Sequence, residues 1–294
     1  MSGCISCPRG CGADRTKDLG VLGVCGMAAQ PVLARAALHQ WEEPCLSGKN
    51  GSGTVFFSGC ALRCVFCQNH EISHGKKGKP VTVQRLREIY QELTQSGAHN
   101  INLVNPTHFI EAVASSLTEP LPVPVVYNSG GYERVQSLRQ LEGKIQIYLP
   151  DLKYADNRLA LRYSGVSDYV EHAVSAITEM HRQTGDCVMG EDGLLQSGVV
   201  IRHLVLPANI KNTIAVIDTV RDLFPNGGVL FSLMGQYIPC GDLSAVPELA
   251  RRVTKREYDK AQEHLFASGI EDGFVQKLSS AKAQYIPLFD YTGV

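Results

Sequence analysis

The sequence predicts an α/β protein whose core is a partial six-unit parallel (β/α) barrel. Short apolar runs rich in β-branched and aromatic residues alternate with helical patterns along the 294 residues. Alternation of this kind specifies parallel strands that are joined by right-handed crossovers. Six strand–helix units are fewer than the eight of a closed barrel, so we expect a barrel that stays open on one side.

The apolar runs and helical patterns give the expected elements. Strands are expected at residues 54–57, 100–104, 122–128, 144–149, 198–205 and 228–234. Helices are expected at residues 82–96, 109–117, 132–141, 157–163, 168–184, 210–224 and 255–268. The first helix has the N-cap residue Thr82 at its start and Gly97 at its end. The Glu-Asp-Gly turn at residues 191–193 indicates a β-hairpin before the fifth strand, and residues 40–53 are expected to form a loop.

The chain is expected to have two parts. Residues 1–50 form a cysteine- and glycine-rich N-terminal extension, and residues 51–294 form the barrel with a C-terminal extension. Cys4 and Cys7 have the spacing of half a zinc knuckle, which Cys11 and Cys25 could complete. The extension is then a metal-binding cap that holds zinc or a second iron–sulfur cluster. The other interpretation is a loop of reduced cysteines that covers one end of the barrel.

Composition argues against several classes of protein. The formal net charge of −1 offers no broad attraction for nucleic acid or for a membrane surface. No apolar run is long enough to cross a bilayer, and the N-terminus lacks the pattern of a signal peptide. Clustered cysteines in such a chain favour a reducing compartment and metal binding over disulfides. We therefore expect a cytoplasmic protein without a membrane or nucleic-acid partner.

Three further cysteines directly follow the first expected strand. Cys60, Cys64 and Cys67 are spaced C-x3-C-x2-C. Three thiolates can hold three irons of a [4Fe–4S] cluster, whereas the usual cluster takes four cysteines. The fourth iron is then open to another ligand, as an open zinc site is in catalysis. Two alternatives are a zinc site completed by His70 or His74, and thiols that serve only as small buried apolar groups.

Polar residues stand at the carboxyl ends of the other expected strands. Because these ends converge on one face of a parallel barrel, the side chains there are candidates for a site. The candidates are Ser58, Asn105, Thr107, His108, Asn128, Ser129, Asp151, Lys153, Arg202, His203 and residues 232–236. His203 points to the opposite strand face from Arg202, so both are not expected to line the site. His108 could instead begin a helix, and Asp151 and Lys153 could form only a strand-end salt bridge.

The cysteine motif, with the aromatic Phe66 before its last cysteine and Gln68 and Asn69 after it, resembles that of the radical S-adenosylmethionine (SAM) superfamily. The chain is more closely similar to an uncharacterised branch related to pyruvate formate-lyase activating enzymes. The matching segments are 7–12 (CPRGCG), 43–48 (EPCLSG), 149–154 (LPDLKY), 202–207 (RHLVLP), 232–237 (SLMGQY) and 289–294 (FDYTGV). This resemblance covers nearly the whole chain and implies the same six-unit barrel.

The resemblance implies an activity and its cofactors. A [4Fe–4S] cluster on Cys60, Cys64 and Cys67 would bind SAM at its open iron and cleave it reductively to methionine and a 5′-deoxyadenosyl radical, which removes a hydrogen atom from a substrate. Asp151 and Lys153 match a pair that helps hold the cofactor in activating enzymes. Together with the strand-end residues, the candidates for cofactor contact are Phe66, Gln68, Asn105, Thr107, Asn128, Asp151, Lys153, Arg202 and Gln236.

The chain departs from the superfamily pattern at the end of the second expected strand. Most radical SAM proteins carry Gly-Gly-Glu there, which binds the amino group of SAM. Here the residues at 104–107 are Val-Asn-Pro-Thr. Backbone carbonyls or the side chains of Asn105 and Thr107 could take that role. No dinucleotide-binding, Walker A or nucleophile-elbow motif is present.

The partners are expected from the resemblance alone. It implies a small reductant such as flavodoxin or ferredoxin, and a glycyl radical enzyme that this chain would activate. The alternative is modification of a small molecule, peptide or RNA by the same chemistry. From a different class, the chain could be a non-catalytic iron–sulfur electron carrier or a zinc-dependent nucleic-acid-binding protein. The near-neutral charge and the full barrel alternation weigh against both.

Overall fold

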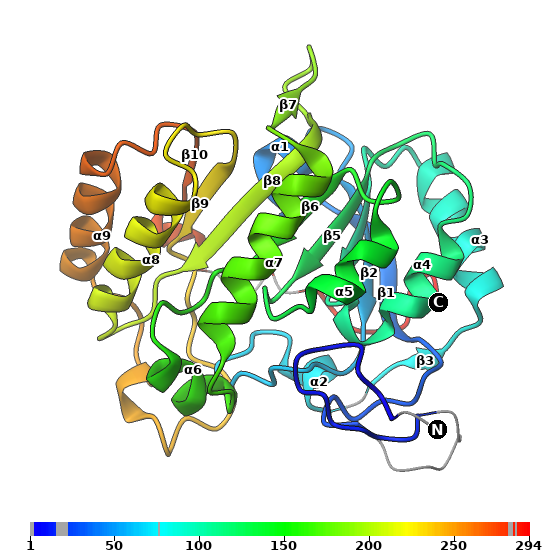
Figure 1. Ribbon diagram of the computed structural model, residues 1–294, viewed down its shortest axis with the longest axis horizontal. Coiled ribbons are helices and arrows are strands. Elements are labelled where there is room, and N and C mark those ends of the chain that lie inside the picture. Colours follow the sequence, from blue (N-terminus) through cyan, green and yellow to red (C-terminus); the bar gives the residue numbers. More distant parts are fainter. Residues whose placement is uncertain (1–2, 16–22, 76, 282–284, 286) are drawn as a thin grey trace.

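One mixed sheet organises the computed structural model of the protein, which describes residues 3–15, 23–75, 77–281, 285 and 287–294 (Figure 1). The sheet order is β10-β9-β8-β6-β5-β4-β2-β1-β3. The parallel strands are β2 (Ser52–Phe57), β4 (Ile101–Val104), β5 (Val125–Ser129), β6 (Ile147–Pro150), β8 (Leu195–Leu204), β9 (Leu230–Met234) and β10 (Gly273–Val275). Consecutive strands are therefore neighbours, and the two outer edges of the sheet do not pair within the described residues. This confirms the predicted partial barrel, although among the described residues β10 adds a parallel strand that was not expected.

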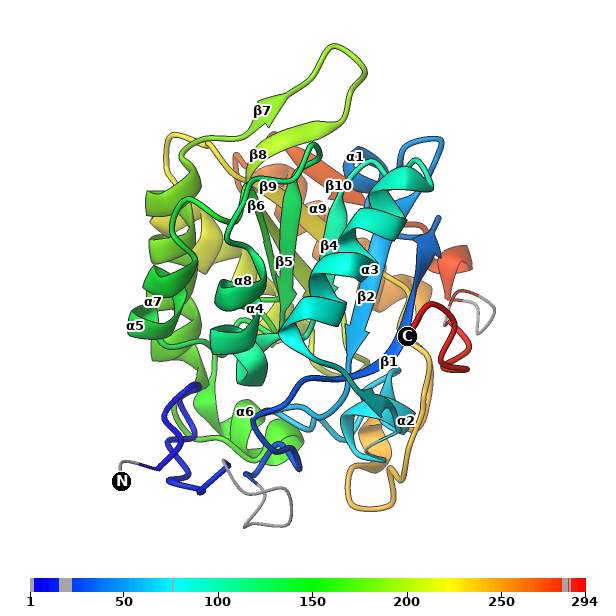
Figure 2. The same cartoon turned by 90° about the vertical axis from the view of Figure 1, so that its right-hand side faces the viewer.

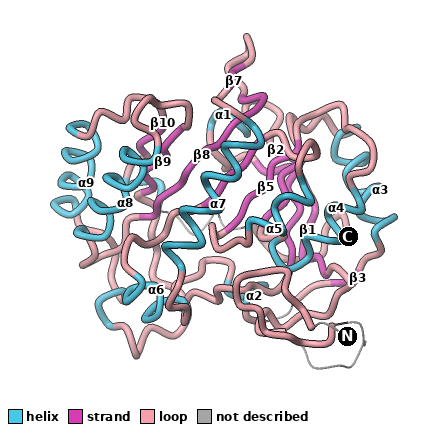
Figure 3. Tube along the Cα trace, in the orientation of Figure 1, coloured by secondary structure: helices cyan, strands magenta, loops and turns pink. Residues whose placement is uncertain are grey.

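Most of the helices lie on the outer side of the sheet, as the crossover rule requires, whereas α6 (Asn157–Ser164) lies past the carboxyl ends of the strands (Figures 2 and 3). The helices are α3 (Val83–Gln95), α4 (Ile110–Ser116), α5 (Val135–Leu138), α6, α7 (Tyr169–Thr184), α8 (Ile210–Leu223) and α9 (Lys255–Ala267). Thr82 caps α3 as predicted, because its side chain accepts a hydrogen bond from Arg85 N. The apolar face of α3, which includes Leu86 and Tyr90, is buried against the sheet. None of the described helices has the length and apolarity needed to cross a membrane.

Several short elements were not expected. Strand β1 (Val32–His39) pairs antiparallel with β2 and with β3 (Lys79–Pro80). Helix α1 (Pro44–Ser47) lies within the expected loop at 40–53, so that expectation was wrong there, and α2 (His70–Ser73) follows the cysteine loop. One turn of helix carries no apolar period, and the alanines of β1 blur its alternation. The division at residue 50 stays a prediction; β1 lies before it and pairs with β2 after it.

Two other boundaries bear on the predictions. The hairpin predicted at 191–193 is confirmed, because β7 (Val188–Met189) pairs antiparallel with β8. The helix predicted at 132–141 is wrong at its start, since α5 begins only at Val135. The reason is Glu133, whose buried carboxyl group accepts hydrogen bonds from Thr107 Oγ1 at 2.6 Å and from Tyr127 OH at 3.2 Å. These contacts hold the chain inward before the helix can begin.

The buried Glu133 makes stability depend on pH. Burial raises its pKa to about 7. The folded state therefore holds this proton at pH values where the unfolded state has released it. The free energy of unfolding consequently falls as pH rises from about 4 to about 7.

Replacing Glu133 by glutamine should remove this dependence. We expect the wild type to lose about 3 kcal/mol more unfolding free energy than Glu133→Gln between acidic and mildly basic pH, at about 1.4 kcal/mol per pKa unit. Anaerobic denaturant unfolding at several pH values measures the difference. Glu263→Gln, at an exposed position of α9, serves as the control. Equal pH slopes for the wild type and Glu133→Gln would contradict the prediction.

Candidate functional site

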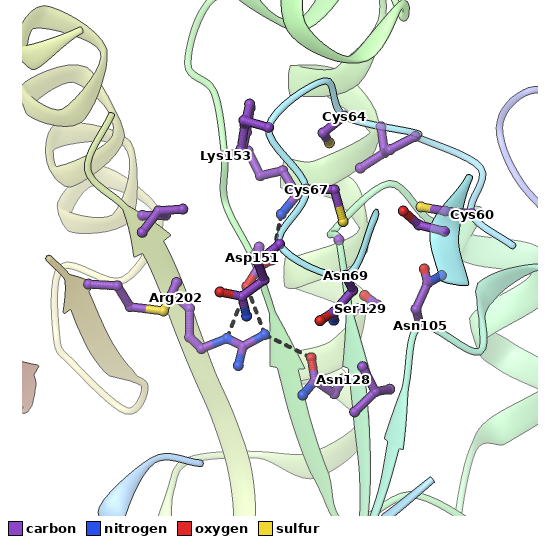
Figure 4. Close-up of a pocket in the computed structure, with 18 of the residues that line it drawn as sticks. Cys60, Cys64, Cys67, Asn69, Asn105, Asn128, Ser129, Asp151, Lys153 and Arg202 are labelled. Carbon is purple, nitrogen blue, oxygen red and sulfur yellow. Dashed lines mark hydrogen bonds and ion pairs between the residues drawn. The ribbon is translucent and has the colours of Figure 1, made fainter. Parts of the chain in front are cut away.

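A cavity opens at the carboxyl ends of the parallel strands (Figure 4). One wall is the segment between β2 and α2, and the other wall is the ends of β4, β5, β6, β8 and β9. The predicted site residues that line it are Cys60, Cys64, Phe66, Cys67, Gln68, Asn105, Asn128, Ser129, Asp151, Lys153, Arg202 and Gln236. Residues that are as many as 176 positions apart in the sequence therefore meet because parallel strands end on one face.

The cysteine loop is held in place by its backbone. Gly59 has φ of 81°, a left-handed conformation that favours glycine, and a Cβ there would collide with Met27. Asn105 Nδ2 donates to Gly59 O at 2.6 Å, and His108 Nε2 lies 2.7 Å from Ser58 O. The loop thus leaves β2 in one direction, which carries its thiols over the cavity.

The three thiols differ in their surroundings. Ser164 Oγ donates to Cys64 Sγ at 2.9 Å. Burial raises the pKa of Cys64, and it raises the pKa of Cys67 to about 12. A cluster binds thiolates, so metal binding must release these protons. As they stand, no three His, Cys, Asp or Glu side chains among the described residues surround one metal position. Cluster binding therefore needs the thiols to turn toward one another.

A network of charges lies opposite the thiols. Arg202 donates from Nε to Asp151 Oδ1 at 2.9 Å, from Nη1 to Glu42 Oε1 at 2.9 Å and from Nη2 to Asn128 Oδ1 at 2.8 Å. Lys153 Nζ lies 2.5 Å from Asp151 Oδ2. All three nitrogen atoms of Arg202 are thus engaged. The arginine orients Asp151 and Asn128, while Lys153 stands between that network and Cys64.

These charged groups stay ionised at neutral pH. Burial by itself would raise the pKa of Asp151, but Arg202 and Lys153 outweigh it and hold that pKa below its usual value. Burial would lower the pKa of Lys153 and of Arg202, but Asp151 outweighs it and raises both. The cavity therefore offers fixed positive and negative groups to a charged ligand.

Several candidates lie outside the cavity lining, including Ser58, whose hydroxyl donates to Lys77 O, and residues 232, 233 and 235. Thr107 is buried and donates to Glu133. His203 Nδ1 lies 2.7 Å from Leu152 O and its Nε2 lies 3.0 Å from Thr213 Oγ1, on the strand face away from Arg202, as expected. His108 is buried below the cysteine loop, where burial lowers its pKa to about 3. It is therefore neutral and positions Ser58.

Sequence reasoning missed Glu42. Besides Arg202, its carboxylate accepts hydrogen bonds from Asn102 Nδ2 and Asn128 Nδ2, each at 3.0 Å. Glu42 lies in the segment before α1. In the sequence, this segment does not follow any of the expected strands, so the strand-end rule does not select it. The only signal was a pair of acidic residues, Glu42 and Glu43, just before a proline, and such a pair is usually exposed.

A second cavity continues from the first. The two share the lining residues Gln68, Asn69, Val104, Asn128, Arg202, Gln236 and Ile238. The second is also lined by His39, Trp41, Glu42 and Tyr285, and it contains no cysteine. The rings of Trp41 and Tyr285 are 4.5 Å apart. This cavity therefore leads from the charge network toward the exposed Trp41 at the surface.

The sequence comparisons bear on the cysteine loop. Residues 46–116 match the family model described as a 4Fe–4S single cluster domain. That segment contains only three cysteines, Cys60, Cys64 and Cys67. The chain is also 28% identical over 270 residues to an uncharacterised protein of Methanocaldococcus jannaschii, covering 88% of this chain and 73% of that protein. The match supports the prediction that this loop holds a [4Fe–4S] cluster.

The structural comparisons bear on the fold. Spore photoproduct lyase superposes with a TM-score of 0.50 at 10% identity, covering 79% of this chain and 78% of that one. Streptococcus suis SuiB, solved with a precursor peptide, gives a TM-score of 0.49 at 10% identity, and the chain spans about half the length of SuiB, 48%, while 76% of this chain is covered. The partial barrel is thus similar in fold to spore photoproduct lyase.

Proposed function

We propose that this protein is a radical SAM enzyme that binds SAM between the cysteine loop and the charge network. The observation that carries this proposal is one cavity with three cluster thiols on one wall and the Asp151–Lys153–Arg202 network on the other. When bound, the reduced cluster supplies one electron that breaks the C5′–S bond of SAM, which yields methionine and a 5′-deoxyadenosyl radical. The protein's part is to bind, orient and exclude water.

The charged groups of the cavity suit the charges of SAM. Lys153, which lies between Asp151 and the thiols, is the candidate partner for the SAM carboxylate. Asn105 takes a left-handed backbone conformation, φ 59°, at the position of the missing Gly-Gly-Glu motif. Its side chain holds Gly59, so its carbonyl is the candidate acceptor for the SAM amino group. Thr107 is engaged with Glu133, which favours Asn105 over Thr107 for that role.

Phe66 is the candidate wall for the adenine. Its ring packs edge-on against Tyr163 and Tyr237, with ring centroids 6.3 Å away in each case. This support holds the ring in one orientation at the cavity surface. Gln68 and Gln236 also line the cavity and can hydrogen-bond to a base or a ribose.

The second cavity is the candidate for the substrate. It begins at Asn128 and Arg202, beyond the proposed SAM position, and runs toward Trp41 and Tyr285. A substrate there would lie next to the residues that are proposed to hold SAM. Glu42 provides a negative group on its wall.

Two finer versions of the activity differ in their substrate. One is activation of a glycyl radical enzyme by hydrogen abstraction from a backbone glycine, which rests on the resemblance to pyruvate formate-lyase activating enzymes. The other is modification of a small molecule, peptide or RNA. Both need a one-electron reductant of flavodoxin or ferredoxin type. To distinguish them, an anaerobic cell extract is divided by ultrafiltration into a protein fraction and a small-molecule filtrate, and each is incubated with the reduced enzyme and SAM. A glycyl radical EPR signal that needs the protein fraction supports activation, whereas turnover with the small-molecule filtrate alone contradicts it.

A different class of function has one specific observation in its favour. Cys240 Sγ donates to Phe66 O at 3.2 Å, so a further thiol lies beside the cluster loop. If it bound the fourth iron, the cluster would be closed and would suit electron transfer only. Its side chain does not line the cavity, which favours the enzyme.

Cluster variants separate these two functions. With dithionite and SAM, we expect Cys64→Ala to lose iron and to reduce 5′-deoxyadenosine formation at least about 100-fold, because even outer-shell partners of a metal site cost about 10- to 100-fold. Cys240→Ser should keep both the iron and the product. Anaerobic reconstitution, iron analysis and chromatography of the product make the comparison. Loss of iron in Cys240→Ser, with no deoxyadenosine from the wild type, would favour the electron carrier.

The charge network predicts a loss of SAM affinity in Asp151→Asn. This change keeps the shape but removes the charge that holds Lys153 and Arg202. We expect SAM to bind roughly 10- to 100-fold more weakly, since hydrogen bonds to charged groups contribute about 1.5–3 kcal/mol. The SAM-dependent change in the EPR signal of the reduced cluster gives the affinity. Asp259→Asn is the matched control, because Asp259 pairs with Lys255 on the surface. Unchanged affinity in a fully loaded Asp151→Asn would contradict this role.

A further inference from the structure

The N-terminal cysteines lie beside the cluster loop but outside its cavity. Cys7 and Cys25 are buried, Cys4 is half-buried and Cys11 is exposed. Residues 4–13 form a loop whose two ends are joined by hydrogen bonds from Cys4 N to Ala13 O at 3.0 Å and from Gly12 N to Cys4 O at 3.2 Å. Because Gly12 bonds to Cys4, the adjacent residue Cys11 lies close to Cys4 in space. Cys7 lies within the loop that the pairing closes.

Gly23 brings a thiol from the other side of the extension into the same space. A carbon added at Gly23 would lie 3.2 Å from Cys25 Sγ and 3.5 Å from Cys11 Sγ. The two sulfur atoms therefore border the gap beside Gly23, which a side chain at position 23 would enter. A single zinc ion, whose bonds to sulfur are about 2.3 Å, needs less space there than a cube of iron and sulfur atoms.

A buried positive charge borders this gap. Arg15 is 8% exposed, and its side chain lies 3.8 Å from the same point at Gly23. Its guanidinium donates to Met27 O, His108 O and Ala28 O, and Nη1 lies 3.6 Å from Cys4 Sγ. Among the described residues, no carboxylate forms an ion pair with it. A buried cation needs a compensating charge, and four thiolates around a divalent ion carry a net charge of −2.

We propose that Cys4, Cys7, Cys11 and Cys25 bind one structural zinc ion, with Arg15 as the neighbouring countercharge. Four thiolates in a closed tetrahedral set are the usual ligands of structural zinc. The thiols must turn toward one point to bind, since no described trio surrounds a metal position as it stands. The same is true of Cys60, Cys64 and Cys67, which lie in the matched cluster domain.

The loop of residues 4–13, which would hold the zinc ion, also supports the cysteine loop that contains Cys60, Cys64 and Cys67. Arg9, between Cys7 and Cys11, donates to Ala61 O at 2.9 Å, to Gly165 O at 2.6 Å and to Ser164 O at 3.0 Å. Ser164 in turn donates to Cys64 Sγ. Zinc would fix the turn that carries Arg9 and would thereby hold the backbone from which the cluster ligands project. The ion has no part in the proposed SAM chemistry; it positions the loop.

Metal analysis of the full chain tests the zinc site. Anaerobically purified wild type is expected to hold about one zinc ion per chain in addition to the iron of its cluster. Gly23→Ala and Cys11→Ser should lose zinc and keep iron. Gly23→Ala alters no ligand, and Gly23 does not have a left-handed backbone, so its effect reports the gap itself. Cys187→Ser, at a cysteine outside both sites, should keep both metals.

Two further readouts make the outcome decisive. Cobalt in place of zinc should give the absorption bands of a tetrahedral thiolate site in wild type and in Cys60→Ala/Cys64→Ala/Cys67→Ala, and not in Cys11→Ser. Hydrogen–deuterium exchange should rise in peptides covering residues 59–67 when zinc is lost. Absence of zinc from wild type after incubation with zinc, or iron bound by these four cysteines, would overturn the proposal. Zinc retained by a protein that never cleaves SAM would refute only the proposed function.

Discussion

The ion pair between Arg202 and Asp151 ties together the interior of the barrel. It joins β8 to the end of β6, and through Asn128 and Glu42 it reaches β5 and the segment before α1. Charges in such a place are costly to remove from water, and they are tolerated when each is paired and hydrogen-bonded. Every nitrogen of Arg202 is engaged, so the guanidinium has one orientation. The polar ends of three strands are therefore aligned before any ligand arrives.

The cysteine loop is the other half of the site, and it depends on contacts from several directions. Asn105 and His108 hold its start from below, Ser164 donates to Cys64, and Arg9 holds the carbonyl of Ala61 from the N-terminal side. A loop held only by its own sequence would sample many conformations at a large entropic cost. Here, contacts with the parts of the chain that pack over the carboxyl ends of the strands offset this loss of conformational entropy. The N-terminal extension thus helps to hold the cysteine loop in position, although its own cysteines lie outside the cavity.

The sequence predicted the elements that have strong hydrophobic periodicity and clear capping or turn residues at their ends. The six expected strands, α3 with its Thr82 cap and the hairpin before β8 are all present. Strand β1 and helix α1 escaped notice, since alanine-rich strands and single helical turns carry little pattern. The start of α5 was misplaced because Glu133 is drawn inward by Thr107 and Tyr127, and both contacts join residues that local patterns cannot connect.

The site divides in the same way. The spacing of Cys60, Cys64 and Cys67 indicated an iron–sulfur loop, with a zinc site or buried thiols as the alternatives, because ligand number and spacing are local properties of a chain. The strand-end rule collected Asn128, Asp151, Lys153 and Arg202, since parallel strands must end on one face. It could not decide that Thr107 turns away to Glu133, nor that Glu42 enters the network from a distant segment. Those outcomes depend on hydrogen bonds and burial between residues far apart in the chain, and only the packed tertiary structure determines which polar groups meet.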